Sequence, residues 1–113
     1  MKTTRVVLTA LLLGLSASVV ALPTFVKEFK DNYKVAKQSK LAQLDCAVCH
    51  VGKSPKLNPY GLDLKKVIAE AKTKKLTPVV LKKVEVIDSD KDGTNNLSEI
   101  KADTNPGDPK SKP

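Results

Sequence analysis

Hydrophobic side chains recur at helical spacing from residue 25 onward, and no segment alternates as a half-buried strand would. In residues 25–33 the apolar face consists of Phe25, Phe29 and Tyr33, and Thr24 can cap the helix. Residues 34–40 are mostly polar and predict a loop, and residues 41–45 predict a short helix that leads into the next segment. The pattern therefore predicts an all-α fold with substantial loop.

Proline positions predict where two further helices begin. Asn58-Pro59 and Thr77-Pro78 each place a capping residue before a proline at the first helical position. The first of these helices is expected over residues 59–72, and the second from Pro78 to about Ile87. Glycine and proline in residues 51–59 predict a loop, and the polar, proline-rich residues 105–113 predict a flexible tail.

The first 21 residues have the composition of a secretory signal peptide. Lys2 and Arg5 precede an apolar run over residues 6–15, and small residues follow the run. Cleavage is expected after Ala21, with Ser18 as the alternative site, which leaves a mature domain over residues 22–113. An uncleaved membrane anchor needs about 18 or more consecutive apolar residues, and this run is shorter. We therefore expect a periplasmic or secreted protein with no membrane span after cleavage.

The expected mature domain is small and basic. It is below the size at which a hydrophobic core alone gives comfortable stability, and it has no Trp. The formal net charge of +8 falls to +6 when Lys2 and Arg5 are removed. Every cationic residue that remains is lysine, which disfavours the bidentate contacts that arginine makes to phosphates and bases. We expect no nucleic-acid partner, and either a partner protein with an acidic docking surface or lysines that serve solubility alone.

The reactive side chains of the chain are concentrated in Cys46-Ala47-Val48-Cys49-His50. Two thiols at this spacing can form thioether bonds to the two vinyl groups of one haem, and the imidazole that follows can bind the iron. A thioredoxin-like site would need a βαβ context, and a zinc site would need more ligands than two Cys and one His. The prediction is one covalent haem c on Cys46 and Cys49 with His50 as the proximal ligand. A Cys46–Cys49 disulfide is the alternative.

The sixth ligand of the iron has several candidates. The sole methionine is Met1, within the expected signal peptide, and no second histidine exists. The candidates are a lysine, the possible distal-side residues Asn58 and Tyr60, the amino group at Leu22, water or an open site, and a ligand from a neighbouring molecule. Because a methionine ligand raises the reduction potential, its absence predicts a potential on the negative side.

A second candidate site lies at residues 88–99, which follow the pattern of an EF-hand calcium loop. Carboxylates occupy the first, third and fifth positions, glycine the sixth, and glutamate the twelfth. Asn95 stands where paired EF-hands carry an apolar residue, so we expect an unpaired loop that Leu97 and Ile100 pack onto the domain. A metal-free acidic turn is the alternative. The expected calcium ligands are Asp88, Asp90, Asp92, the backbone carbonyl of Thr94, Asn96 through its side chain or a water, and Glu99.

Taken together, these motifs resemble small periplasmic monohaem cytochromes c in which C-x-x-C-H-V-G-K leads to an N-x-Y-G turn and a D-x-D-x-D-G segment follows. The matching residues are 46–53, 58–61 and 88–99. The resemblance implies a small cytochrome c-like helical domain around one covalent haem, with a C-terminal calcium loop. Some similar cytochromes use a distal cysteine as the sixth ligand, and this chain has no third cysteine to do so.

The leading functional hypothesis is electron transfer by an exported, non-enzymatic haem protein with an acidic redox partner. A second hypothesis is the binding of a small gas at an open iron site. A third is self-association into a dimer or polymer, in which a neighbouring chain supplies the sixth ligand. The spin state of the ferrous haem and its response to carbon monoxide separate the first two, and concentration-dependent spectra indicate the third.

Overall fold

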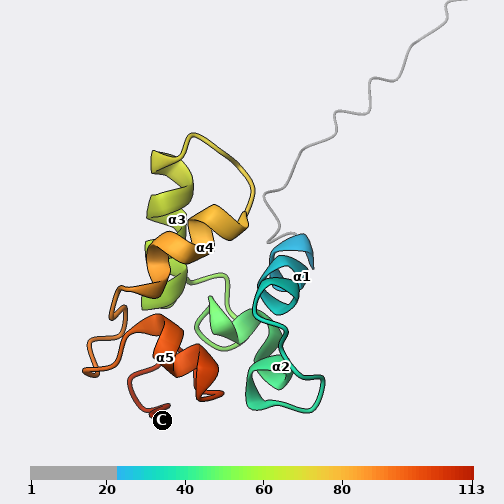
Figure 1. Ribbon diagram of the computed structural model, residues 1–113, viewed down its shortest axis with the longest axis vertical. Helices are drawn as coiled ribbons and strands as arrows, with labels where there is room; N and C mark the ends of the chain where they lie inside the picture. The colour runs from blue at the N-terminus through green and yellow to red at the C-terminus, as the bar shows by residue number, and fades with distance from the viewer. Residues whose placement is uncertain (1–22) are drawn as a thin grey trace, which may run out of the picture.

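The computed structural model describes residues 23–113, which form five α-helices and one 3₁₀ helix and contain no named strand (Figure 1). In chain order the elements are α1 (Pro23–Asn32), α2 (Lys40–Leu44), the 3₁₀ helix η1 (Asp45–Val48), α3 (Pro59–Glu70), α4 (Pro78–Glu85) and α5 (Asn96–Lys101). The all-α prediction is confirmed for this part of the chain, in which no helix is both long and apolar enough to cross a bilayer. The predicted signal peptide and its cleavage site lie outside the described residues.

Helices α3 and α4 begin where the sequence predicts, whereas α1 begins at Pro23, so Thr24 lies inside that helix and does not cap it. The Asn58 side chain accepts the Gly61 N–H to cap α3, and the Thr77 side chain accepts the Val80 N–H to cap α4. A proline occupies the first turn of each helix, where its missing N–H costs no helical hydrogen bond. Helix α3 ends at Glu70, two residues earlier than predicted, and the next residues lead into the left-handed backbone conformation of Lys72.

Helix α5 is an element that the sequence did not predict. The side chain of Asn95 accepts the Ser98 N–H at 2.9 Å, so that a helix starts inside the last third of the predicted calcium loop. The core residue Ile100 is 7% exposed, whereas Leu97 is only partly buried. The expected packing of the loop onto the domain is therefore made chiefly by Ile100.

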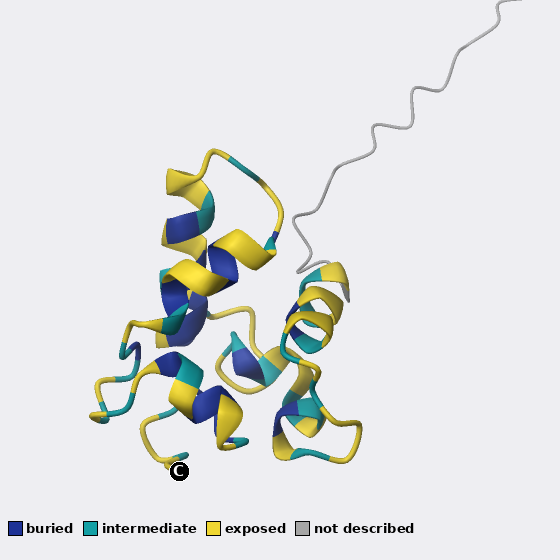
Figure 2. Cartoon of the chain, in the orientation of Figure 1, coloured by how far each residue is buried: buried dark blue, intermediate teal, exposed yellow. Residues whose placement is uncertain are grey.

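The hydrophobic core lies between α3 and α4, and α1 and α5 also pack against α4. Figure 2 shows the buried positions on the inward sides of these helices. The buried apolar residues come from every helix and from the segment before α4; they are Phe29, Leu41, Val48, Tyr60, Leu64, Val67, Leu76, Val80, Leu81, Val84 and Ile100. Two of these, Leu41 and Val48, belong to the segment around the Cys-x-x-Cys-His motif, so the motif is anchored directly in the core.

The flexible tail predicted from residue 105 differs from the structure at its beginning. Asn105, Pro106 and Gly107 are buried, and so is Thr104 before them. The Asn105 side chain donates to the Ala47 carbonyl at 3.0 Å, a contact that joins the C-terminal segment to the Cys-x-x-Cys turn. This long-range contact, together with the burial of Pro106, explains why residues with the composition of a tail are packed into the fold.

Candidate functional site

Cys46, Cys49 and His50 lie on one tight turn. The carbonyl oxygen of Cys46 accepts the N–H of Cys49 at 3.2 Å and that of His50 at 2.9 Å, which closes the turn over the length of η1. Asp45, directly before the turn, has φ of 47°, and this left-handed conformation lets the chain change direction between α2 and η1. The turn brings both sulfur atoms and the imidazole to the wall of a single cavity.

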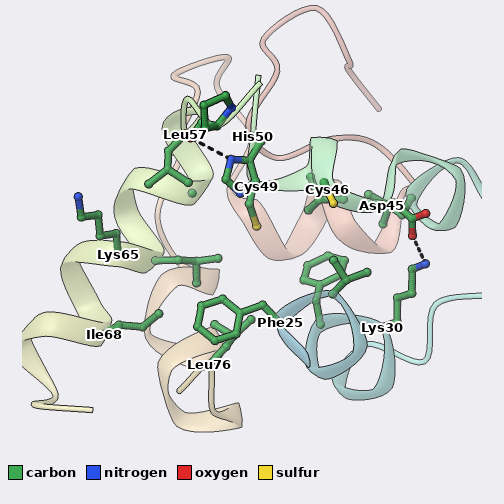
Figure 3. Close-up of a pocket in the computed structure, with 17 residues that line it drawn as sticks. Phe25, Lys30, Asp45, Cys46, Cys49, His50, Leu57, Lys65, Ile68 and Leu76 are labelled. Atoms are coloured by element: carbon green, nitrogen blue, oxygen red, sulfur yellow. Dashed lines mark hydrogen bonds and ion pairs between the residues drawn. The ribbon is translucent and has the colours of Figure 1, made fainter. Parts of the chain in front are cut away.

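This cavity has a volume of about 620 Å³, within the range of about 300–1,000 Å³ that is usual for cofactor sites. In Figure 3 the Cys49 sulfur points into it, with Phe25, Ile68 and Leu76 on the opposite wall. The full lining is Phe25, Val26, Phe29, Lys30, Leu41, Asp45, Cys46, Val48, Cys49, His50, Pro55, Leu57, Gly61, Leu64, Lys65, Ile68 and Leu76. Most of these side chains are apolar, as the site of a large hydrophobic macrocycle would require.

The charged residues of the lining are Lys30, Asp45 and Lys65. Lys30 forms an ion pair with Asp45, and Lys65 projects from the exposed side of α3. Figure 3 shows both lysine side chains at the periphery of the cavity rather than across its middle. The cavity therefore combines an apolar interior with two cationic groups at its edge, and nothing in the sequence distinguished these two lysines from the others.

A hydrogen bond orients the imidazole of His50. Its Nδ1 lies 3.2 Å from the carbonyl oxygen of Pro55, an atom that can only accept. This contact places a proton on Nδ1, and in the neutral imidazole it leaves the lone pair of Nε2 available for a metal. Pro55 is held in reach because Val51 donates its N–H to the Lys56 carbonyl at 2.8 Å and closes the loop. The role of Pro55 was not predicted, because its contribution is a backbone oxygen.

Asn58 and Gly61 fasten α3 to the Cys-x-x-Cys turn. Asn58 Nδ2 donates to the Val48 carbonyl at 2.8 Å, and the Asn58 N–H donates to the Cys49 carbonyl at 2.8 Å. A Cβ atom on Gly61 would lie 2.2 Å from that same Cys49 oxygen, so only glycine allows the helix to approach this closely. The N-x-Y-G motif is thereby explained as a structural support of the turn.

Asn58 and Tyr60, the two possible distal-side residues, are not among the residues that line the cavity, and their role toward an iron stays a prediction. The polar atoms of the Asn58 side chain are bonded to the backbone of the turn and of α3. Tyr60 is 1% exposed and packs edge-on against Phe29, with ring centroids 6.2 Å apart. The face of α3 that lines the cavity instead carries Gly61, Leu64, Lys65 and Ile68, the spacing of one helical face.

The two cysteines differ in their surroundings, although both are free thiols. Cys46 is exposed, whereas Cys49 is partly buried against the core. Burial raises the pKa of the Cys49 thiol to about 12, and the nearby Cys46 raises it further. An unmodified Cys49 is therefore a poor nucleophile in this environment.

Four of the predicted calcium ligands form a compact cluster. Asp88, Asp90, Asp92 and Glu99 each offer a carboxylate oxygen, and these atoms all lie within 4.8 Å of one another. The loop is shaped by Asp88, whose carboxylate accepts the N–H groups of Asp92 at 3.2 Å and Gly93 at 2.9 Å. Carboxylates at this separation repel one another unless a cation lies between them.

Glu99 is the most informative member of this cluster. It is 0% exposed, and neither of its carboxylate oxygens has a hydrogen-bond partner. Burial raises the pKa of Glu99 to about 9, and the neighbouring Asp92 and Asp90 act in the same direction. One oxygen of Asp90 and one of Asp92 are also buried without a partner. Buried, unpaired carboxylate oxygens that converge on one point are what an oxygen-coordinated cation site requires.

The side chain of Asn96 has a different role from the one predicted. It is 0% exposed, its Nδ2 donates to the Val84 carbonyl at 2.9 Å and to Ser89 Oγ at 2.8 Å, and its Oδ1 accepts the Ser89 N–H. These contacts attach the acidic loop to α4. The Asn96 side chain thus has a structural role, and its predicted contribution to the metal, like that of the Thr94 backbone carbonyl, stays a prediction.

Comparison with known proteins found no relative of this chain. No protein-family model matches the chain, and neither a curated protein nor a solved structure was found to match it.

Proposed function

We propose that this chain is an exported monohaem c-type cytochrome whose function is electron transfer. The observation that carries the proposal is the convergence of Cys46, Cys49 and His50 on one apolar cavity, with the imidazole held as the Nδ1–H tautomer by Pro55. Cys46 and Cys49 would hold the haem through thioethers, and His50 Nε2 would bind the iron. A bound haem supplies an iron that cycles between the ferrous and ferric states.

The residues around the turn serve this function by limiting motion. The Asn58 side chain and N–H bind the carbonyl groups of Val48 and Cys49, and Gly61 lets α3 approach closely, so that the attachment residues would keep one geometry in both oxidation states. The apolar lining excludes water from the cofactor, and such burial is one of the factors that tune a haem potential. No bond of a substrate is made or broken, and the protein is not an enzyme in this proposal.

The sixth position of the iron determines which of two functions the haem performs. Among the cavity-lining residues the nitrogen bases other than His50 are Lys30 and Lys65, and Lys30 is paired with Asp45. A low-spin iron with a ligand from a lysine or a neighbouring chain supports electron transfer. An open position supports the binding of a small gas, which is the second candidate because neither Asn58 nor Tyr60 lines the cavity.

The visible spectrum of the purified exported protein tests this proposal. Low-spin ferrous bands that do not respond to carbon monoxide are expected for an electron carrier, together with a reduction potential on the negative side. A high-spin spectrum that shifts with carbon monoxide would favour gas binding, and a spectrum that depends on protein concentration would favour a ligand from a second copy. A potential like that of a His/Met cytochrome would contradict the proposed ligation.

The partner that we propose is a redox protein with an acidic docking surface. Lys30 and Lys65 lie at the edge of the cavity, and Lys53 and Lys56 flank Pro55 in the loop beside it. Opposite charge at the entrance of an electron-transfer site raises the association rate and makes it sensitive to salt. The rate of electron exchange with an acidic partner should therefore fall as ionic strength rises.

The second cofactor that we propose is a calcium ion at the acidic cluster. Asp88, Asp90, Asp92 and Glu99 supply the hard oxygen ligands, and the complete burial of Glu99 without a partner favours a bound cation over a metal-free turn. The ion would offset the repulsion among the four carboxylates and so stabilise the fold. Chelation should lower the melting temperature of the holoprotein, and an unchanged melting temperature on metal-verified material would contradict the site.

A further inference from the structure

Residues 103–107, which we call the strap, connect the acidic cluster to the haem-attachment turn. The strap begins one residue after the C-cap Ala102 of α5, the helix that carries Glu99, and residues 104–107 of the strap are buried. Figure 1 shows the chain after α5 returning beneath the helix, toward the middle of the fold. The two candidate sites are thus joined by a short, packed segment of the same chain.

At one end, the strap is tied to Glu99. The N–H and the hydroxyl of Thr104 both donate to the Glu99 carbonyl oxygen, at 2.9 and 3.0 Å. The Asp103 N–H donates to the carbonyl of the core residue Ile100 at 3.1 Å. The Glu99 side chain, in contrast, lies in the acidic cluster without a hydrogen-bond partner. The residue that would bind the cation is therefore joined through its backbone carbonyl to Thr104 by two hydrogen bonds.

At the other end, the strap holds the segment that carries the cysteines. The Asp103 carboxylate accepts the N–H groups of Lys40 at 2.8 Å and Leu41 at 2.9 Å, at the start of the helix that leads into the turn. Asn105 Nδ2 donates to the Ala47 carbonyl at 3.0 Å, between the two cysteines. The strap therefore contacts the attachment segment both before and within the turn.

The backbone of the strap also touches the support of the turn from the side of α3. A Cβ atom on Gly107 would lie 2.3 Å from Asn58 Cγ, so Gly107 packs directly against the side chain that binds the Val48 carbonyl. The Gly107 N–H donates to Asn105 Oδ1 at 2.9 Å, which orients the amide that reaches Ala47. The strap therefore contacts both the turn and the Asn58 side chain that supports it.

We propose that Asp103 and Asn105 are positioning residues through which cation binding at the acidic cluster sets the geometry of the Cys46–His50 turn. This inference rests on the proposed haem and calcium functions and adds a regulatory link between them. Calcium binding then alters the haem environment. By linkage, the factor by which calcium changes the equilibrium constant of haem reduction equals the factor by which reduction changes the calcium affinity. Couplings of this kind are typically about 5- to 150-fold.

The experiment uses the full exported holoprotein, with calcium chloride as the added ligand and sodium chloride at matched ionic strength as the salt control. The visible circular dichroism of the haem and its reduction potential are measured with calcium and with a chelator. Calcium affinity is measured by calorimetry in the ferric and ferrous states. The parent protein should show a calcium-dependent haem signal and a calcium affinity that differs at least about fivefold between the two states.

Two variants test the role of the strap. Asn105→Asp keeps an oxygen for the Gly107 N–H and replaces the donor to Ala47, so it should bind calcium but reduce the affinity difference to less than about twofold. Asp103→Asn keeps the size of the side chain and weakens its hydrogen bonds to the N–H groups of Lys40 and Leu41 at the start of α2. It replaces the first variant as the test if that variant does not fold. Lys101→Gln, at an exposed position at the end of α5, should behave as the parent.

Each outcome has one meaning. Calcium binding with an unchanged haem signal and potential overturns this inference and leaves the proposed haem and calcium functions standing. An equal coupling in the parent and both strap variants also overturns it. A holoprotein that does not bind calcium removes the cation site and this inference together, and an exported chain without haem removes the proposed function as well.

Discussion

The Asn58 side chain has two roles whose contributions to stability can be measured separately. Its Oδ1 accepts the Gly61 N–H at 2.9 Å as the cap of α3, and its Nδ2 donates to the turn, to the Val48 carbonyl at 2.8 Å and to the Ala47 carbonyl at 3.3 Å. The side chain is 5% exposed, so water cannot readily replace either contact. Loss of an N-cap costs about 0.5–2 kcal/mol, and a buried carbonyl left without its donor costs about 1–3 kcal/mol. Asn58→Ala should therefore lower the free energy of unfolding by about 1.5–5 kcal/mol.

Two further variants divide this loss into its parts. Asn58→Ser retains an oxygen that can cap α3 but cannot reach the Val48 carbonyl, and it should cost about 1–3 kcal/mol. Asn95→Ala is the matched control, because Asn95 caps α5 at 2.9 Å from an exposed position and has no second contact of this kind. It should cost about 0.5–2 kcal/mol.

Urea unfolding of the three variants in saturating calcium, followed by far-ultraviolet circular dichroism, gives these free energies. The dependence on urea should keep its slope, because the surface exposed on unfolding is nearly unchanged. Equal losses in Asn58→Ala and Asn95→Ala would refute the reasoning. The hydrogen bond to Val48 would then contribute nothing, and Asn58 would be an ordinary helix cap.

Three further predictions concern Gly61, the thiols and Glu99. Gly61→Ala places a Cβ 2.2 Å from the Cys49 oxygen and should cost about 1–3 kcal/mol or more while lowering the ratio of haem to protein absorbance; an unchanged ratio would contradict the close approach. In chain prepared without haem, iodoacetamide should label exposed Cys46 before Cys49, whose pKa burial raises to about 12, and peptide mass spectrometry that finds equal rates would count against this difference. Because burial raises the pKa of Glu99 from 4.5 to about 9, its contribution to the stability of the calcium-free fold is fully present below about pH 4.5 and is lost as pH rises through about 9. Unfolding at stepped pH should show that loss without calcium and not with it, and Glu99→Gln should lack it; a loss that persists in the variant would assign it to another group.

Most of the helices could be predicted because their signals are local. Asn58-Pro59 and Thr77-Pro78 place a cap and a proline side by side, and both helices start there. Helix α5 could not be separated from the calcium-loop pattern, because its cap Asn95 and its residue Glu99 both belong to that pattern. The motif determined which residues to expect at the site, but not where a helix begins within it.

The direction of a side chain within a helix was harder to predict than the helix. Tyr60 directly precedes Gly61, yet Gly61 lines the cavity while Tyr60 turns into the core beside Phe29. Adjacent residues of a helix point in directions about 100° apart, so proximity in sequence to His50 does not place a residue on the distal side. Only the packing of α3 against its neighbours decides which face meets the cavity.

The strap could not be predicted because its burial depends on contacts between distant parts of the chain. Asn105 and Ala47 are separated by 58 positions, and the composition after residue 104 is that of a tail. Asp103 similarly caps a helix that begins 63 positions earlier. Neither contact leaves a local sequence signal, because an Asn or Asp that binds a distant part of the chain cannot be told in the sequence from one that faces solvent.

The intact mass of the chain exported by a bacterial host that attaches haem to proteins tests the central claim most directly. We predict the mass of the chain cleaved after Ala21 plus one haem, with the haem absorbance still bound to the chain after denaturation. Replacement of both Cys46 and Cys49 by serine should abolish this attachment. A mature chain whose mass shows no haem, and whose two thiols are free to be alkylated or joined in a disulfide, would contradict the account.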